Sequence, residues 1–80
     1  MIMANIHYIW IDFTNANGSV HSKLVYNGEM EETAASEAMD KISKDRQLQL
    51  KPRWMKDVKK IELSAQTIEG DVRYRTTTYL

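Results

Sequence analysis

The chain has 80 residues, no cysteine and equal numbers of acidic and basic residues. A chain of this length forms one domain with a thin core, because it buries only about 60% of its unfolded surface. The absence of cysteine excludes a disulfide framework and a thiolate zinc site. No apolar run approaches the roughly 18 residues of a membrane span, and the first residues lack the basic region of a signal peptide. We therefore expect a soluble, cytoplasmic protein without a membrane partner.

The charges are divided unevenly along the chain. Residues 1–40 contain one basic and six acidic residues, whereas residues 41–80 contain ten basic and five acidic residues. Such a bipolar molecule steers partners electrostatically, but its zero net charge makes it a poor general binder of polyanions.

The first predicted strand, residues 6–13, carries large β-favouring side chains on both faces, which is typical of a central strand. Asn17-Gly18 follows, and this pair predicts a two-residue type I′ turn, because both residues tolerate a positive φ. A loop of that length determines the hairpin register. The predicted cross-strand pairs are Ile9 with Tyr26, Ile11 with Leu24, Trp10 with Val25, and Asp12 with Lys23. A second strand as long as the first continues past Gly28, and we expect a bulge there.

A helix is predicted over residues 34–46. Thr33 is expected to cap its N-terminus, since a threonine hydroxyl accepts a hydrogen bond from a free backbone N–H of the first turn. Apolar positions recur at the helical period and form one stripe, which consists of Ala35, Ala38, Met39 and Ile42. Asp40 and Lys44 are spaced as a favourable ion pair on the helix surface.

Residues 47–55 are expected to form a loop, because Pro52 is incompatible with a continuing helix. Strands are predicted over residues 58–68 and 72–80, where apolar and polar residues alternate, with Glu69-Gly70 as the turn between them. The predicted fold class is α+β: a four-stranded antiparallel sheet (ββαββ, order 2-1-3-4) with one helix packed on one face. Residues 1–80 form this single α+β domain.

No motif of a known catalytic site is present, whether a phosphate loop, a dinucleotide fingerprint, a nucleophile elbow or a metalloprotease helix. His7 and His21 are the acid–base candidates, but the predicted register places them on opposite faces of the sheet. Asp12 lies diagonal to His21 in that register, a pairing more typical of a surface ion pair than of a catalytic dyad. We predict no catalytic residue, no metal ligand and no cofactor, and hence a protein that is not an enzyme.

The predicted sheet face away from the helix gathers aromatic and charged side chains. By strand alternation it contains Tyr8, Trp10, Asp12, His21, Lys23, Lys60, Glu62, Arg73, Arg75 and Tyr79. Aromatics and arginines on an open sheet suit base stacking with phosphate neutralisation, as in single-strand nucleic-acid binders. The same composition is typical of hot spots in protein interfaces. A third interpretation is a solvated face on which Tyr8 and Trp10 merely cover the central strand.

A basic stretch around a tryptophan, residues 51–56, precedes the third strand. Its Arg53 and Lys56 are suited to phosphates or to an acidic protein surface. Alternatively, the stretch is a solvated loop whose Trp54 folds back onto the edge of the thin core.

The order of elements, hairpin then helix then hairpin, resembles that of small phage-encoded inhibitors, including some anti-CRISPR proteins and some inhibitors of host RNA polymerase. The similarity covers the outline of the whole chain, namely residues 8–13, residues 20–26, the helix opened by Thr33, and residues 61–65 and 73–79. It includes no diagnostic motif, so it assigns no functional residue. The resemblance implies a non-enzymatic protein that blocks a larger machine by binding it.

The sequence therefore predicts a non-catalytic protein-binding module, an inhibitor of a host nucleic-acid-handling complex, whose partner is a larger protein or a ribonucleoprotein. The predicted partner-binding residues are Tyr8, Trp10, Lys23, Arg73, Arg75 and Tyr79, with Arg53, Lys56 and Lys60 as a basic rim. The alternative is a nucleic-acid-binding domain that uses the same face. The strand edge at residues 76–79 carries little charge, so a monomer and a homodimer paired at this edge are both compatible with the sequence.

Overall fold

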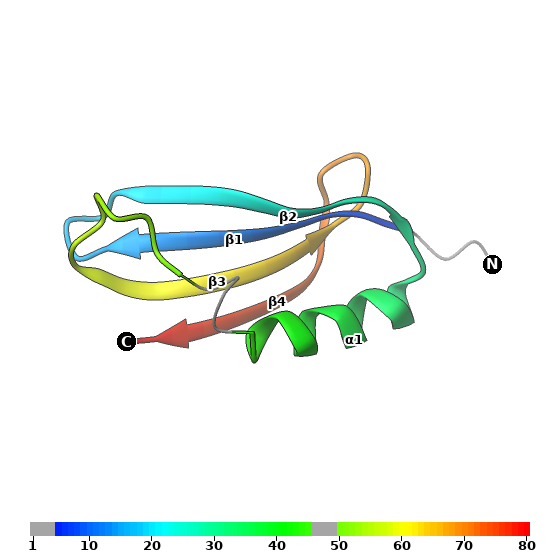
Figure 1. The fold of residues 1–80 in the computed structure, drawn as a ribbon. Coiled ribbons are helices and arrows are strands. Elements are labelled where there is room, and N and C mark those ends of the chain that lie inside the picture. The colour runs from blue at the N-terminus through cyan, green and yellow to red at the C-terminus, as the bar shows by residue number, and fades with distance from the viewer. Residues whose placement is uncertain (1–4, 46–49) are drawn as a thin grey trace.

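The computed structural model describes residues 5–45 and 50–80 of the chain. They form one sheet of four antiparallel strands in the order β2-β1-β3-β4, together with one helix. The elements are β1 (Ile6–Asn15), β2 (Val20–Met30), α1 (Glu32–Ser43), β3 (Val58–Gln66) and β4 (Val72–Tyr79). Helix α1 runs alongside the first part of β4 and also contacts β1 and β3 (Figure 1). The predicted α+β class and strand order are confirmed.

The core lies on the side of the sheet that carries α1. Alternate residues of β1, namely Ile9, Ile11 and Phe13, have no exposed surface, because their side chains point to this side from a central strand. Leu63 and Ala65 of β3 stand opposite Ile11 and Ile9 and are also buried. The alternation predicted for β3 and the central position predicted for β1 are therefore confirmed.

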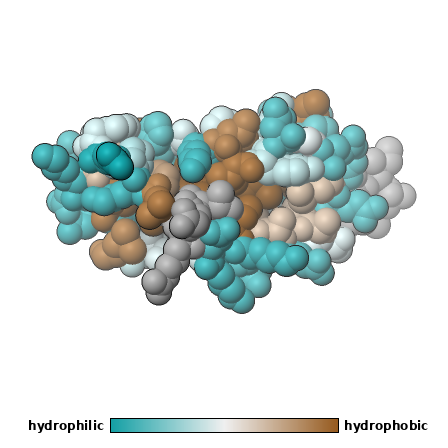
Figure 2. All heavy atoms as spheres, in the orientation of Figure 1, coloured by the Kyte–Doolittle hydropathy of each residue, from teal (hydrophilic) through white to brown (hydrophobic). Residues whose placement is uncertain are grey.

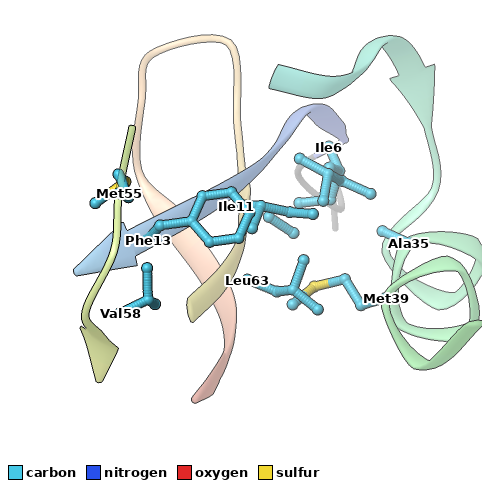
Figure 3. Packing of buried hydrophobic residues seen from close by; sticks show 10 residues of the cluster. Ile6, Ile11, Phe13, Ala35, Met39, Met55, Val58 and Leu63 are labelled. Atoms are coloured by element: carbon cyan, nitrogen blue, oxygen red, sulfur yellow. The ribbon is translucent and has the colours of Figure 1, made fainter. Parts of the chain in front are cut away.

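The core has two ends that are covered by different segments (Figure 3). At one end, Ala35 of α1 lies near Ile6 and Met39 of α1 lies beside Leu63, as the predicted helical stripe requires. At the other end, Met55 from the connection between α1 and β3 lies beside Phe13. Seen from this side, hydrophobic residues gather over the middle of the sheet and polar residues surround them (Figure 2). Helix α1 alone is too short to cover the length of β1, so the connection completes the core.

The first hairpin closes with a loop of three residues rather than the predicted two. The backbone N–H of Asn15 donates to the carbonyl of Ser19 at 2.9 Å, which encloses residues 16–18. Gly18 has a φ of 89°, whereas Asn17 does not have the positive φ that a type I′ turn requires. The Oδ1 of Asn17 instead accepts a hydrogen bond from the N–H of Ser19 at 2.9 Å. This side-chain bond stabilises the loop with the asparagine in its ordinary backbone region.

The second hairpin repeats this arrangement. The N–H of Thr67 donates to the carbonyl of Asp71 at 2.9 Å, and Gly70 occupies the third loop position with a φ of 91°. The turn predicted at Glu69-Gly70 is confirmed. Each of the two hairpin loops thus depends on one glycine in the left-handed region.

The extra loop residue changes the register of the first hairpin. Ile11 faces Lys23 and Trp10 faces Leu24, so the predicted pairs Ile11–Leu24, Trp10–Val25 and Asp12–Lys23 are wrong. A register shift beside Val25 then restores the predicted pair of Ile9 with Tyr26. Further along, a second shift lets β2 continue past Gly28 to Met30, as predicted.

The N-terminus of α1 differs from the prediction. The N-cap is Glu31, whose side chain makes no capping hydrogen bond, and Thr33 lies inside the first turn. Because the bulged β2 extends to Met30, the helix begins directly after the strand and Thr33 comes too late to cap it.

The C-terminus of α1 also lies earlier than predicted, at Ser43. The predicted last helical residue, Arg46, falls outside the described residues. The ion pair of Asp40 with Lys44 is confirmed, with 3.2 Å between the Lys44 Nζ and the Asp40 Oδ2. Both side chains are exposed, so this pair contributes little to stability.

Replacing Gly18 with alanine should lower the free energy of unfolding by about 1–2 kcal/mol, because an L-residue is strained in the left-handed region. No atom lies within 4 Å of an added Cβ, so the cost is one of backbone conformation alone. Urea unfolding at an unchanged m-value measures the loss. Gly18→Asn is the matched control and should lose less, since asparagine tolerates this region better than alanine. Equal stability of Gly18→Ala and the wild type would contradict the loop geometry.

Candidate partner-binding surface

The sheet face away from α1, here called the open face, is formed by alternate residues of all four strands. Helix α1 and residues 50–57, which are the described segments outside the strands and hairpin turns, pack on the opposite side of the sheet. The open face contains four rows of cross-strand neighbours. In the order β2, β1, β3, β4 they are Asn27-Tyr8-Gln66-Val72, Leu24-Trp10-Ser64-Arg75, Ser22-Asp12-Glu62-Thr77 and Val20-Thr14-Lys60-Tyr79. Of the predicted residues, Tyr8, Trp10, Asp12, Lys60, Glu62, Arg75 and Tyr79 do lie on this face.

One part of the open face is apolar. Trp10 lies between Leu24 and Ser64, with Tyr8 two residues away on the same strand. Leu24 has 39% of its surface exposed, and the aromatic residues are half-buried. Ser64 is only 4% exposed although no helix covers it, so neighbouring side chains shield it from solvent. Tyr8, Trp10 and Leu24 therefore form a group of large side chains, here called the Trp10 platform.

The centre of the open face is acidic. Asp12 and Glu62 stand directly opposite each other on β1 and β3, an arrangement of like charges that costs stability. Glu62 is compensated, because its Oε1 lies 3.4 Å from the Arg75 Nε and its Oε2 accepts a hydrogen bond from Thr77 at 3.0 Å. Within the described ranges, the Asp12 carboxylate has no hydrogen-bond or ion-pair partner. The open face therefore presents one uncompensated carboxylate beside the Trp10 platform.

Two basic residues predicted for the open face lie elsewhere. Lys23 stands opposite Ile11 on the α1 side, because the three-residue loop inverts its alternation. Arg73 sits at the register shift near the start of β4. Its Nε donates to the Glu32 carboxylate of α1 at 2.8 Å, so its charge is used within the fold. The open face is consequently much less basic than predicted.

The predicted basic rim divides in the same way. Lys60 lies on the open face opposite Tyr79, as predicted. Arg53 and Lys56 are exposed, but they belong to the segment that packs on the α1 side. Lys56 lines a hollow of about 350 Å³ beside the first hairpin turn, together with Trp54 and turn residues. These two residues do not extend the open face.

The histidines do not form a site. His21 stands opposite Phe13 on the α1 side, where its ring meets Trp54 edge-on at 5.3 Å. His7 lies near the other end of β1, and its buried Nδ1 has no partner in the described part of the chain. The prediction that His21 lies on the open face is wrong, because the three-residue loop inverts its alternation as it does that of Lys23. Among the residues that the structure describes, no group of three or more His, Asp or Glu side chains is placed to hold a metal ion.

The residues that the sequence did not place on the open face come mainly from the edge strands, and they include Val20, Ser22, Leu24 and Asn27 of β2 and Val72 of β4. Their positions follow from the three-residue loop and from the bulges in β2 and β4. A glycine after Asn17 was the available signal, but it fits loops of two and three residues equally well.

No protein-family model, curated protein or solved structure matches this chain. No helix in the described part of the molecule has the length and apolar character needed to cross a membrane.

Proposed function

We propose that this chain is a non-catalytic protein-binding module that engages a larger protein through the open face. The observation that carries the proposal is the uncompensated Asp12 carboxylate beside the Trp10 platform, on a sheet face that no described segment covers. A half-buried tryptophan with an adjacent leucine is suited to a hot spot. An acidic group at its side adds charge complementarity toward a basic partner.

The charges favour a protein partner over nucleic acid. Of the basic residues predicted to meet phosphates, Lys23 and Arg73 face the α1 side, and Arg75 is paired with Glu62. The two carboxylates at the centre would repel a phosphate backbone. A protein surface rich in lysine and arginine fits this face instead.

The mode of action that we propose is inhibition of a nucleic-acid-handling complex in the host cell. Such complexes hold their substrates in basic grooves, and the acidic centre of the open face is suited to compete for such a groove. The resemblance in element order to small phage-encoded inhibitors, among them anti-CRISPR proteins, supports the same conclusion.

Affinity capture from host lysate tests the proposal with two open-face variants. Trp10→Ala should weaken capture of the partner roughly 30-fold or more, as for a hot-spot tryptophan. Asp12→Lys should abolish capture while preserving the fold, because the new lysine faces Glu62 and replaces a like-charge pair with an opposite-charge pair. The matched control is Lys23→Ala, an exposed substitution on the α1 side, which should capture as the wild type does.

Two results would overturn the proposal. One is a partner that Lys23→Ala loses and Asp12→Lys retains, which would place the interface on the other side of the sheet. The other is direct binding of a single-stranded oligonucleotide that weakens steeply with salt, which would indicate the nucleic-acid-binding alternative.

A further inference from the structure

Strand β4 is an edge of the sheet, and its outward backbone groups can be identified. The N–H of Leu80 donates to the carbonyl of Lys59 at 2.9 Å, so Leu80 is hydrogen-bonded toward β3. In an antiparallel ladder such bonded positions alternate. The backbone groups of Arg75, Thr77 and Tyr79 therefore point away from β3 and are free to pair with another strand.

This edge lacks the features by which proteins usually prevent strand pairing. From Tyr74 to Tyr79 the register with β3 is regular, and the segment contains no proline, glycine or lysine. The charge of Arg75 is compensated by Glu62. The other edge, β2, differs, because two register shifts interrupt its pairing with β1 and Lys23 lies in its middle.

A groove of about 250 Å³ lies beside the β4 edge on the α1 side. Its lining comes from both elements: Tyr74, Arg75 and Thr76 of β4, and Ser36, Met39, Asp40 and Ser43 of α1. A strand added to β4 would place alternate side chains over this groove.

We propose that two copies of this chain associate through β4, antiparallel and centred on Thr77, to form one continuous sheet of eight strands. Outward-pointing residues must meet each other, so Thr77 pairs with Thr77 of the second copy and Arg75 with Tyr79 of the second copy. On the α1 side, Thr76 then faces Thr78 of the second copy, and Tyr74 faces Leu80 of the second copy.

The occupant is a second copy because the edge is complementary to itself in this register. The Arg75–Tyr79 pairs suit cation–π contacts on the open face. Leu80, which is 67% exposed, meets the groove of the other copy near Met39. A register centred on Arg75 would instead place two arginines opposite each other, which is unfavourable.

The position of α1 is compatible with this dimer. The helix lies alongside the first part of β4 and leaves the end near the C-terminus uncovered (Figure 1). A two-fold axis at Thr77 therefore places the two helices at opposite ends of the interface between the two β4 strands. The open faces of both copies lie on the same side, and each contributes Tyr79 beside Arg75 of the other. The dimer thus doubles the open face without using the Trp10 platform.

Single-cysteine variants test the register, because the chain has no cysteine of its own. Thr77→Cys should form a disulfide-linked dimer under mild oxidation, since paired positions in a ladder lie about 5.5 Å apart, within disulfide reach. Thr76→Cys should cross-link far less, because its own counterpart is a diagonal neighbour. Ser22→Cys, an exposed position on β2, sets the background of random collision. Cross-linking of Thr76→Cys above Thr77→Cys, or of all three equally, would overturn the proposal.

Sedimentation equilibrium tests the association without cross-linking. The wild type should show a concentration-dependent dimer, and Thr77→Pro should remain monomeric, because proline removes an outward N–H that β3 does not use. Thr77→Val is the matched control: it loses the hydroxyl bond to Glu62 but retains the N–H, so it should still dimerise. A monomeric wild type up to about 0.5 mM, a concentration that detects millimolar affinity, would also overturn the proposal.

Discussion

Replacing Phe13 with alanine should lower the free energy of unfolding by about 3–5 kcal/mol. Phe13 is the largest side chain that is fully buried, and it lies on the central strand β1. Met55 lies beside Phe13 in the core, so the cavity can close only if Met55 moves (Figure 3). A domain of 80 residues has a total stability of only about 4–12 kcal/mol. The loss is therefore a large part of the total, and urea unfolding should show a much lower midpoint.

Two further variants test whether the loss of stability comes from the cavity in the core. Phe13→Leu retains much of the apolar volume and should lose less than half as much as Phe13→Ala. Trp10→Ala, on the other face of the same strand, should also lose less, because Trp10 is half-buried and its removal opens no enclosed cavity. A loss below about 1 kcal/mol for Phe13→Ala would contradict a core centred on β1, since buried aromatics normally cost several times more.

The strand order could be predicted from the sequence because it depends on features that are repeated along each strand. The first strand is apolar on both faces, the later strands alternate, and only a central position for β1 satisfies both patterns. Likewise, the apolar stripe of α1 is visible at the helical period, and its Ala35 and Met39 are buried as predicted. A prediction that rests on many residues remains correct even when one local feature, such as a turn, is predicted wrongly.

The composition of the open face could not be predicted as well, because each strand's alternation depends on one local event. An additional residue in the first loop moves Lys23 and His21 to the α1 side. A register shift near Arg73 turns this residue toward Glu32, although its neighbour Arg75 keeps the predicted side. Bulges leave a weak sequence signal, since they are set by contacts with distant segments.

These corrections change the expected chemistry of the surface more than its position. The aromatic residues predicted for the open face are present there, because Tyr8 and Trp10 belong to β1, which defines both faces. The basic residues came mainly from the edge strands, where the register changes. A face predicted to be aromatic and basic is therefore aromatic with an acidic centre, and a basic protein surface becomes the better partner.

The connection between α1 and β3 illustrates the same limit for the core. Trp54 is expected from the sequence to fold back onto the core edge, but it is 62% exposed and its ring meets that of His21 edge-on. Its neighbour Met55 is fully buried. The N–H of Met55 donates to the carbonyl of Pro52 at 3.0 Å, and this turn directs Met55 inward. Residue size alone did not distinguish these neighbours.

The second large effect is expected at Met55. Met55→Ala should lower the free energy of unfolding by about 2–5 kcal/mol, because it removes the side chain that closes the core beside Phe13. Trp54→Ala should cost only about 0.5–1.5 kcal/mol, the usual contribution of one aromatic contact. The two positions are adjacent, so solvent, loop length and charge are matched, and urea unfolding compares them directly. A larger loss at Trp54 than at Met55 would show that the tryptophan closes the core. The observed burial requires the reverse order, since only a side chain enclosed on all sides leaves a cavity when it is removed.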